Sequence, residues 1–132
     1  MSNRNQNLQW AKENNIRFDQ RIEDEPDLRG IYGIFVGDEC AYVGRAYGIY
    51  YRLFSGNCHI RDIRIGESNQ KINNAFENGI QIEIKILEVV PLQEDNKAKD
   101  AQRLASRECY WIDYYQNKDQ CLEQFPEGRW GE

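Results

Sequence analysis

The pattern of apolar and polar positions predicts two strands in this chain, one apolar on both faces and one that alternates. Residues 30–36 are Ile, Tyr, Phe and Val set between glycines, so both faces are apolar and the strand is expected at the buried centre of a sheet. Residues 80–89 alternate without a break, with Gln81, Glu83 and Lys85 on the polar face. The apolar face consists of Ile80, Ile82, Ile84 and Ile86. This alternation predicts an edge strand with one face toward water.

The central strand is predicted to turn back into a second strand over 40–44, through Gly37-Asp38-Glu39. The length of this turn decides whether Tyr32 and Tyr42 share a face. A three-residue loop pairs Val36 with Cys40, Ile34 with Tyr42, and Tyr32 with Gly44. Because side chains alternate along a strand, this register puts both tyrosines on one face, whereas a two-residue loop separates them.

Three segments are predicted to be helical, over 47–54, 68–79 and 98–116. In the second of these, Ser68 or Asn69 is the expected N-cap and Gly79 the expected stop. Ile72 and Phe76 lie one turn apart and are expected to face inward.

The predicted fold is one α+β domain over 30–132, with a small, mainly antiparallel three-stranded sheet flanked by helices. Residues 1–29 are interpreted as a peripheral N-terminal extension, with a short helix over 8–15 and an acidic connector broken by Pro26. At 132 residues the chain is long enough for one ordinary domain and too short for two.

A carboxylate interrupts the apolar stripe of the last helix. The stripe consists of Ala101, Leu104, Ala105, Trp111, Ile112 and Tyr115. Glu108 lies in its middle, four residues from both Leu104 and Ile112. A carboxylate on a buried face is costly unless a cation or hydrogen bonds compensate it. Two interpretations follow: Glu108 pairs with an arginine, or it binds a metal such as Mg²⁺, which often uses only one or two protein carboxylates.

Composition is that of a globular protein, with 40% hydrophobic and 30% charged residues. No run of about 18 apolar residues occurs, so no membrane span is expected. The N-terminal stretch is polar, unlike a secretory signal, and a cytoplasmic location is expected.

The charge is acidic overall and uneven along the chain. The net charge is -5 and the pI about 5.0, which argues weakly against nucleic acid as a partner. Residues 44–74, however, hold five cations against Asp62 and Glu67, a net +3 that leaves -8 for the rest. The five cations are Arg45, Arg52, Arg61, Arg64 and Lys71. They form either a local nucleic-acid-binding face or ordinary solvated charge.

The four cysteines, Cys40, Cys58, Cys109 and Cys121, include no C-x-x-C pair. A zinc site that combines Cys58, His59 and a distant cysteine is one interpretation. Reduced, mostly buried thiols are the favoured one.

Four sequence features occur in a characteristic order: GIY at 30–32, YVG at 42–44, Arg52 eight residues after Gly44, and Glu108 within SRECYWIDYY. Together they resemble the GIY-YIG endonuclease family over about residues 30–116. The order of predicted elements, a hairpin, two helices, a strand and a helix, is also similar to that family.

The resemblance implies a divalent-metal-dependent endonuclease that hydrolyses DNA phosphodiester bonds with Mg²⁺ or Mn²⁺. It implies that Tyr32 and Tyr42 position a water and a phosphate oxygen, one of them as general base. Arg52 matches the arginine that contacts the scissile phosphate, and Glu108 the glutamate that holds the metal. Arg45 stands where many members have a basic residue. A phenol is a poor base at neutral pH unless cations, here Arg45 and Arg52, lower its pKa.

Two positions depart from the family pattern. Gly56 stands four residues after Arg52, where many members have a histidine or tyrosine, and His59 is the nearest substitute. Asn117, nine residues after Glu108, is the nearest match to an asparagine found further along in many members. Two alternatives therefore stay open: a nucleic-acid-binding module that does not cut, and a protein-interaction domain. For a nuclease, DNA is the partner, and double-strand breaks are expected to need a second copy or a targeting protein.

Overall fold

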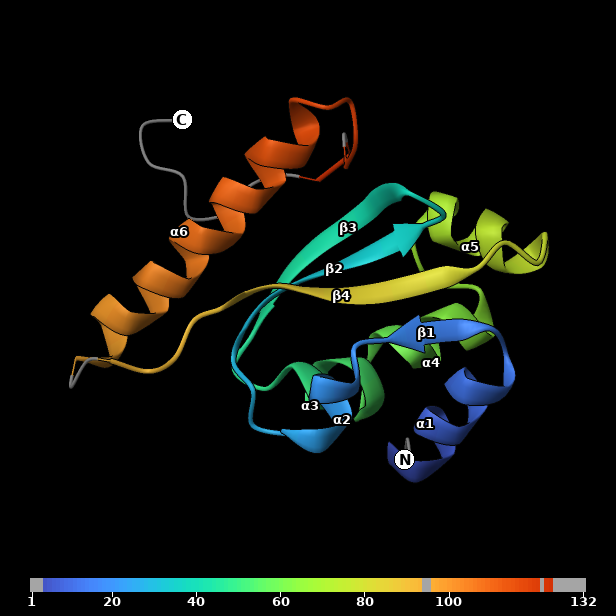
Figure 1. Ribbon diagram of the computed structural model, residues 1–132, viewed down its shortest axis with the longest axis horizontal. Helices are drawn as coiled ribbons and strands as arrows, with labels where there is room; N and C mark the ends of the chain where they lie inside the picture. Colours follow the sequence, from blue (N-terminus) through green and yellow to red (C-terminus); the bar gives the residue numbers. More distant parts are fainter. Residues whose placement is uncertain (1–3, 94–95, 122, 125–132) are drawn as a thin grey trace.

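The computed structural model describes residues 4–93, 96–121 and 123–124, which form an α+β fold around one mixed four-stranded sheet (Figure 1). Its elements are α1 (Arg4–Glu13), β1 (Ile16–Phe18), α2 (Gln20–Asp24), β2 (Gly30–Val36), β3 (Glu39–Ala46), α3 (Ile49–Phe54), α4 (His59–Ile65), α5 (Gln70–Glu77), β4 (Ile82–Val89) and α6 (Lys97–Gln116). The strand order is β1-β4-β2-β3. The α+β class predicted from the sequence is confirmed.

The sheet has one strand more than predicted. β2 is central, as expected, and pairs antiparallel with both β3 and β4. The short β1 then pairs in parallel with the start of β4, Ile16 opposite Ile82. The three-stranded sheet and the edge position of β4 were therefore wrong, because three residues are too few to show a strand period. Ile80, expected to face the core, precedes β4 and is 49% exposed.

The N-terminal segment packs on the domain, which the sequence did not reveal. Ala11 of α1 and Ile22 of α2 are fully buried, and Ile16 of β1 is nearly so. The buried Asn7 donates a hydrogen bond of 2.8 Å from its side-chain amide to the Phe54 carbonyl of α3. Because these anchors are single residues in a polar segment, they gave no apolar stripe and the segment was interpreted as peripheral.

The hairpin reaches the predicted register by an unpredicted route. Val36 pairs with Glu39, so the loop has two residues, with Gly37 at φ +59° in its first position. A bulge in β3 then shifts the pairing by one residue. The predicted Val36–Cys40 pair is wrong, but Ile34 still pairs with Tyr42 and Tyr32 with Gly44. The bulge restores the shared face that a two-residue loop alone would have lost.

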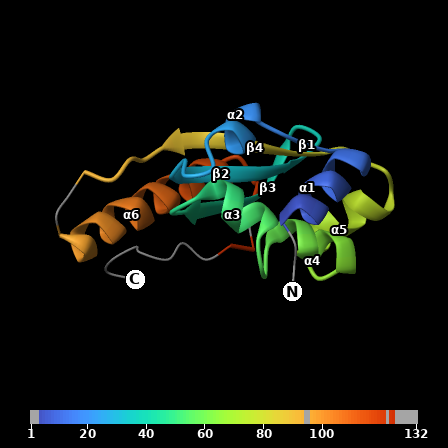
Figure 2. The ribbon, with the colours of Figure 1, turned by 90° about the horizontal axis from the view of Figure 1, so that it is seen from below.

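Helices cover the two faces of the sheet unequally. Figure 2 shows α6 at one end of the molecule and α1, α4 and α5 at the other. Tyr32 and Ile34 of β2 pack into the larger core with α1, α3, α4 and α5. The opposite face of β2, with Ile31 and Phe35, packs against Leu104 and other residues of α6.

The predicted helices largely match the structure. α6 begins one residue before the predicted start, with the Asn96 side chain accepting from the Lys99 backbone N–H. α5 is capped by Asn69, one of the two predicted caps, which accepts from Ile72. The sequence missed α4, whose seven residues follow α3 closely and carry no full apolar repeat.

Candidate functional site

Three aromatic side chains from three elements meet on one face of the sheet. Tyr32 comes from β2, Tyr42 from β3, and His59 is the first residue of α4. A hydrogen bond of 2.6 Å joins the Tyr32 hydroxyl to His59 Nε2. The ring centroid of Tyr42 lies 6.4 Å from that of Tyr32 and 5.0 Å from that of His59. The sequence placed the tyrosines together and named His59 as a candidate, and in the structure His59 contacts both tyrosines.

Gly44 makes room for the Tyr32 ring. The two residues are cross-strand partners, and a Cβ built on Gly44 would lie 2.4 Å from the Tyr32 hydroxyl oxygen. Any side chain at this position would push the hydroxyl away from His59. The sequence analysis overlooked this role of Gly44, although the predicted pairing of Tyr32 with Gly44 was the signal for it.

Burial keeps Tyr32 protonated. Desolvation is the main cause that raises the pKa of Tyr32 well above its ordinary value, followed by Tyr42. The positive charge of Arg52 lowers this pKa and the negative charge of Glu108 raises it, both by less than burial does. The expected lowering of a phenol pKa by cations therefore fails for Tyr32. This residue is a neutral hydrogen-bonding group, fully shielded from water.

His59 is neutral for the same reason. Its burial lowers the pKa of the imidazole to about 3, and the charge of Arg52 adds to the effect. At neutral pH the ring therefore carries one proton on its two nitrogens and pairs with Tyr32 as a neutral partner.

Arg52 lies beside this aromatic group, near the end of α3. Its Nη1 donates a hydrogen bond of 3.1 Å to the carbonyl of Asn57, in the loop before α4. Its charge acts on the phenol of Tyr32 and on the imidazole of His59, so the guanidinium lies within electrostatic range of both. Arg52 is therefore a cation that lies near the tyrosine–histidine group.

Glu108 pairs with an arginine, as one of the two sequence interpretations held. Arg45 Nη1 lies 2.5 Å from Glu108 Oε1. The Glu108 side chain is 10% exposed and that of Arg45 34% exposed, so the pair reaches from the α6 side of the sheet to the surface. The ion pair compensates the buried carboxylate, which otherwise would be strongly disfavoured.

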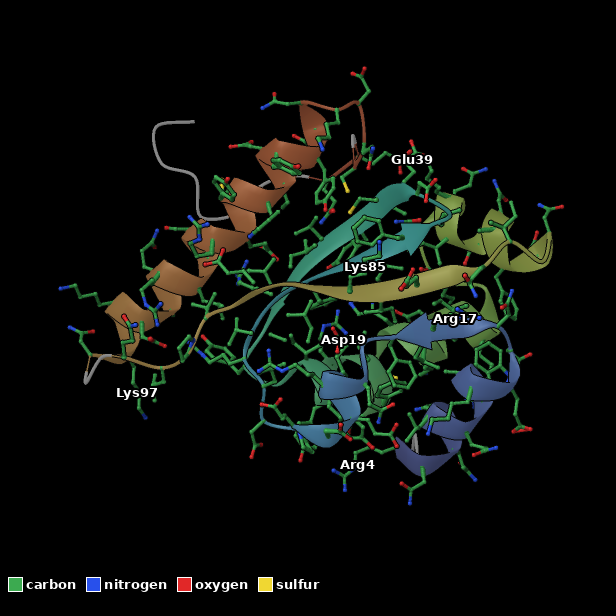
Figure 3. The ribbon with its side chains drawn as sticks, viewed as in Figure 1. Arg4, Arg17, Asp19, Glu39, Lys85 and Lys97 are labelled. Atoms are coloured by element: carbon green, nitrogen blue, oxygen red, sulfur yellow. The ribbon has the colours of Figure 1, made fainter. Side chains whose placement is uncertain are left out.

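The other predicted nucleic-acid-binding cations disperse. Arg61 pairs with Asp62 at 3.4 Å, and Lys71 of α5 pairs with Glu39. Figure 3 shows Glu39 at the tip of the hairpin. Arg64 lines a groove against α1, with Trp10. Asn117, the C-cap of α6, is nine residues or about 13 Å along the helix from Glu108. These residues do not join the group around Tyr32.

Tyr42 lines a pocket of about 400 Å³ to which neither Tyr32 nor His59 contributes. Asn69, Lys71 and Cys121 contribute to its lining. Asn69 also donates a hydrogen bond of 3.1 Å from its side chain to the Ala41 carbonyl, which ties α5 to the hairpin. Tyr42 therefore links the buried aromatic group to an open surface.

Among the residues that the structure describes, no group of three or more His, Cys, Asp and Glu side chains gathers to hold a metal. The zinc interpretation therefore lacks a third ligand there, and Cys58 instead accepts a contact of 3.5 Å from the Asn7 amide. Mg²⁺ makes a smaller demand, since it keeps most of its waters and binds through one or two carboxylates. A single carboxylate at Glu108 fits that coordination chemistry.

In the described part of the chain, no helix is long and apolar enough to cross a membrane.

Comparison with known proteins gives no match to a family model, to a curated protein or to a solved structure. The resemblance to the GIY-YIG endonucleases therefore stays a prediction from the sequence motifs.

Proposed function

We propose that this protein is a divalent-metal-dependent endonuclease that hydrolyses DNA phosphodiester bonds. One observation carries the proposal: Tyr32 of β2, Tyr42 of β3 and His59 of α4 are in mutual contact. Arg52 is held nearby by its hydrogen bond of 3.1 Å to the Asn57 carbonyl, two residues before His59. Phosphodiester hydrolysis needs this combination of proton-transfer groups and positive charge.

The two tyrosines take different roles in this proposal. Tyr42 is only partly buried and can meet a substrate, so it is the phenol that orients the attacking water. Tyr32 is fully buried and bonded to His59, so it acts through its neighbours and holds the Tyr42 ring in place. Arg52 supplies positive charge where the phosphate gains negative charge in the transition state.

Glu108 would hold the metal ion. When bound, Mg²⁺ or Mn²⁺ supplies positive charge to the phosphate and the leaving oxygen. Arg45 fixes the direction of the carboxylate, since its guanidinium contacts Oε1. The same arginine is exposed enough to contact a backbone phosphate.

A second candidate function is DNA binding without cleavage. The Arg45–Glu108 ion pair favours it, because Arg45 already neutralises the one carboxylate proposed for the metal. In this case Arg45 and Arg52 would serve as phosphate contacts only, and the tyrosines as packing residues.

A plasmid assay distinguishes these candidates. With Mg²⁺ or Mn²⁺, supercoiled plasmid should convert to nicked circles, because one active site cuts one strand; with EDTA it should stay supercoiled. Light scattering on the same sample gives the mass of the cutting species. Linear product from a proven monomer, with no nicked intermediate, would contradict single-strand cutting. DNA binding without any cleavage would select the second candidate.

The salt dependence of binding gives a further check. Three of the five predicted cations, Arg45, Arg61 and Lys71, are paired with carboxylates in the structure. The protein should therefore contact few phosphates, and the affinity for duplex DNA should fall with a log–log slope of about three to four. A slope above about six would show a larger cationic surface than this fold presents.

A further inference from the structure

Two cysteines far apart in sequence lie in contact beside the candidate site. Cys40 is near the start of β3, and Cys121 follows α6, 81 positions further along the chain. Their sulfur atoms are 3.3 Å apart, and Cys121 Sγ also lies 3.3 Å from the Cys40 carbonyl oxygen. A disulfide bond needs about 2.05 Å, so the two sulfurs are little more than 1 Å from bonding distance.

Neighbouring glutamines fix this approach. The Cys40 backbone N–H donates to Gln120 Oε1 at 2.7 Å. The side-chain amide of Gln124 makes two hydrogen bonds with the Val43 backbone: it accepts from the N–H at 2.6 Å and donates to the carbonyl at 2.7 Å. The residues on either side of Cys121 therefore act like a partner for the outer edge of β3. The sulfur contact follows from this docking and not from a single flexible side chain.

The pair also has unequal chemistry and an access route. Cys121 lines the pocket of about 400 Å³ next to Tyr42, so a small reagent can reach it, whereas Cys40 is fully buried. The hydrogen bond with Cys40 and the charge of Lys71 lower the pKa of Cys121, while the same contact and burial raise the pKa of Cys40. Cys121 is thus the thiol that a reagent entering the pocket meets first, and Cys40 the one placed to react second.

We propose that Cys40 and Cys121 form a redox pair that hydrogen peroxide or an organic hydroperoxide oxidises to an intramolecular disulfide. The Cys121 thiolate attacks a peroxide oxygen, the O–O bond breaks, and the sulfur becomes a sulfenic acid as one water or alcohol leaves. The Cys40 sulfur then attacks the sulfenic sulfur and displaces its oxygen as water. Two thiols are oxidised by two electrons while one peroxide is reduced.

The disulfide would lock the segment around Cys121 onto β3. Asp119, Cys121, Glu123 and Gln124 line one side of the pocket beside Tyr42, so the disulfide would tie that side covalently to β3, where hydrogen bonds alone hold it in the reduced protein. The bond would also close a loop of 81 positions, which restrains the unfolded chain strongly. The inference does not depend on the proposed nuclease function, since its measurements concern thiols and stability only.

The test titrates the full-length protein with hydrogen peroxide and counts free thiols after denaturation. Wild type should fall from four to two thiols and lose 2 Da, and peptide mapping should join the Cys40 and Cys121 peptides. The oxidised protein should melt about 10 °C higher than the reduced protein, and reduction should reverse the shift. Cys40→Ser and Cys121→Ser should each abolish the shift.

Cys109→Ser is the matched control, because Cys109 is a partly exposed thiol outside the pair. It should keep the cross-link and the rise in melting temperature. A wild-type protein that keeps four thiols at peroxide levels that oxidise free cysteine would overturn the proposal. The proposal would also be overturned if peroxide gave a covalent dimer of the wild-type protein that does not form in Cys109→Ser. An unchanged melting temperature after cross-linking of Cys40 to Cys121 would overturn it as well.

Discussion

The tyrosine–histidine group and the Glu108 side chain of the Arg45–Glu108 pair are both largely buried, yet the first is neutral and the second belongs to an ion pair. Tyr32 and His59 stay neutral, because burial raises the pKa of the phenol and lowers that of the imidazole. Glu108 is buried to a similar degree but lies 2.5 Å from a guanidinium. Burial therefore removes charge where neutral groups meet, and tolerates charge where an opposite charge is in contact.

This difference divides the proposed work of the site. The neutral half, which is the tyrosine–histidine group, can position reacting groups and share protons. Its geometry is well fixed because water is excluded from it. The charged half can interact with a metal or a phosphate, because Arg45 reaches the surface. Variants in the charged half should therefore change the rate of cleavage, whereas variants in the neutral half should change its packing and the stability of the fold.

The largest effect is expected from Glu108→Ala. Loss of the only carboxylate proposed for the metal should slow cleavage on the order of 10³-fold, while DNA affinity stays within a few-fold. Arg45 can rehydrate because it is one-third exposed, so the fold should survive with a loss of about 1–2 kcal/mol. Single-turnover cleavage, DNA binding and circular dichroism measure the three quantities.

Glu88→Ala is the control for that variant. Glu88 also accepts from an arginine of α6, Arg107, at 2.8 Å, but on β4. It should retain cleavage at the wild-type rate. If Glu108→Ala cuts as well as Glu88→Ala does, Glu108 serves only as the ionic partner of Arg45.

Arg52→Ala is expected to have the next largest effect. A cation that meets the phosphate in the transition state should be felt in the rate, by about 10²-fold, and much less in affinity. Arg64→Ala, on the last turn of α4 against α1, should leave both unchanged. Equal losses of rate and affinity in Arg52→Ala would make Arg52 a binding residue only.

Gly44→Ala tests the order of the neutral half. The new methyl group would lie 2.4 Å from the Tyr32 hydroxyl, so the ring must shift, at a cost of about 2 kcal/mol. Urea denaturation measures this loss. In a Tyr32→Leu background the outer ring atoms of Tyr32 are gone and the contact with the Tyr42 ring at 2.9 Å remains, so the same substitution should cost less than it does in the wild-type protein. An equal cost in both backgrounds would show that the Tyr42 ring or the β3 backbone, and not the Tyr32 ring, opposes the methyl group.

The sequence predicted the parts of this molecule whose signal lies in long periodic segments. The length of α6 and the apolar face of Ile82 and Ile84 follow from periods that span two turns or four alternations, and the central position of β2 follows from a run of seven residues that is apolar on both faces. β1 is three residues long and gains its place from pairing with β4, which no local pattern encodes. The same holds for α1, whose contacts join residues more than 40 positions apart.

The residues of the candidate site could be predicted from the sequence, but their pKa shifts and ion pairs could not. Motif spacing selected Tyr32, Tyr42 and Arg52, and the register placed the tyrosines on one face. The direction of the Tyr32 pKa shift was not predictable, because it depends on how much of the phenol is desolvated. Nor was the pairing of Lys71 with Glu39, since it joins α5 to the hairpin tip.

The titration of His59 gives the most specific effect, because His59 is the only histidine in the chain, and at pH 5.5 it is also the smallest. Its pKa is about 3 in the folded protein and near its ordinary value of 6.5 in the unfolded chain. Below pH 6.5 the unfolded chain therefore binds a proton that the folded protein refuses, and stability falls as the pH drops toward 3. Above pH 6.5 this contribution is constant.

The expected loss is about 1.4 kcal/mol at pH 5.5, and a similar further amount at pH 4.5, relative to a His59→Asn variant in which this titration is absent. Carboxylates that titrate in the same range affect both proteins equally, so the difference between their unfolding free energies isolates the imidazole. Imidazole ¹H and ¹⁵N shifts should stay constant down to about pH 4 in the folded protein. Arg52→Ala should move this titration upward, because the guanidinium is one of the two causes of the low pKa. An imidazole that titrates near pH 6.5 in the native protein would show that water reaches the Tyr32–His59 hydrogen bond, and the contrast between a dry neutral half and a charged half would be lost.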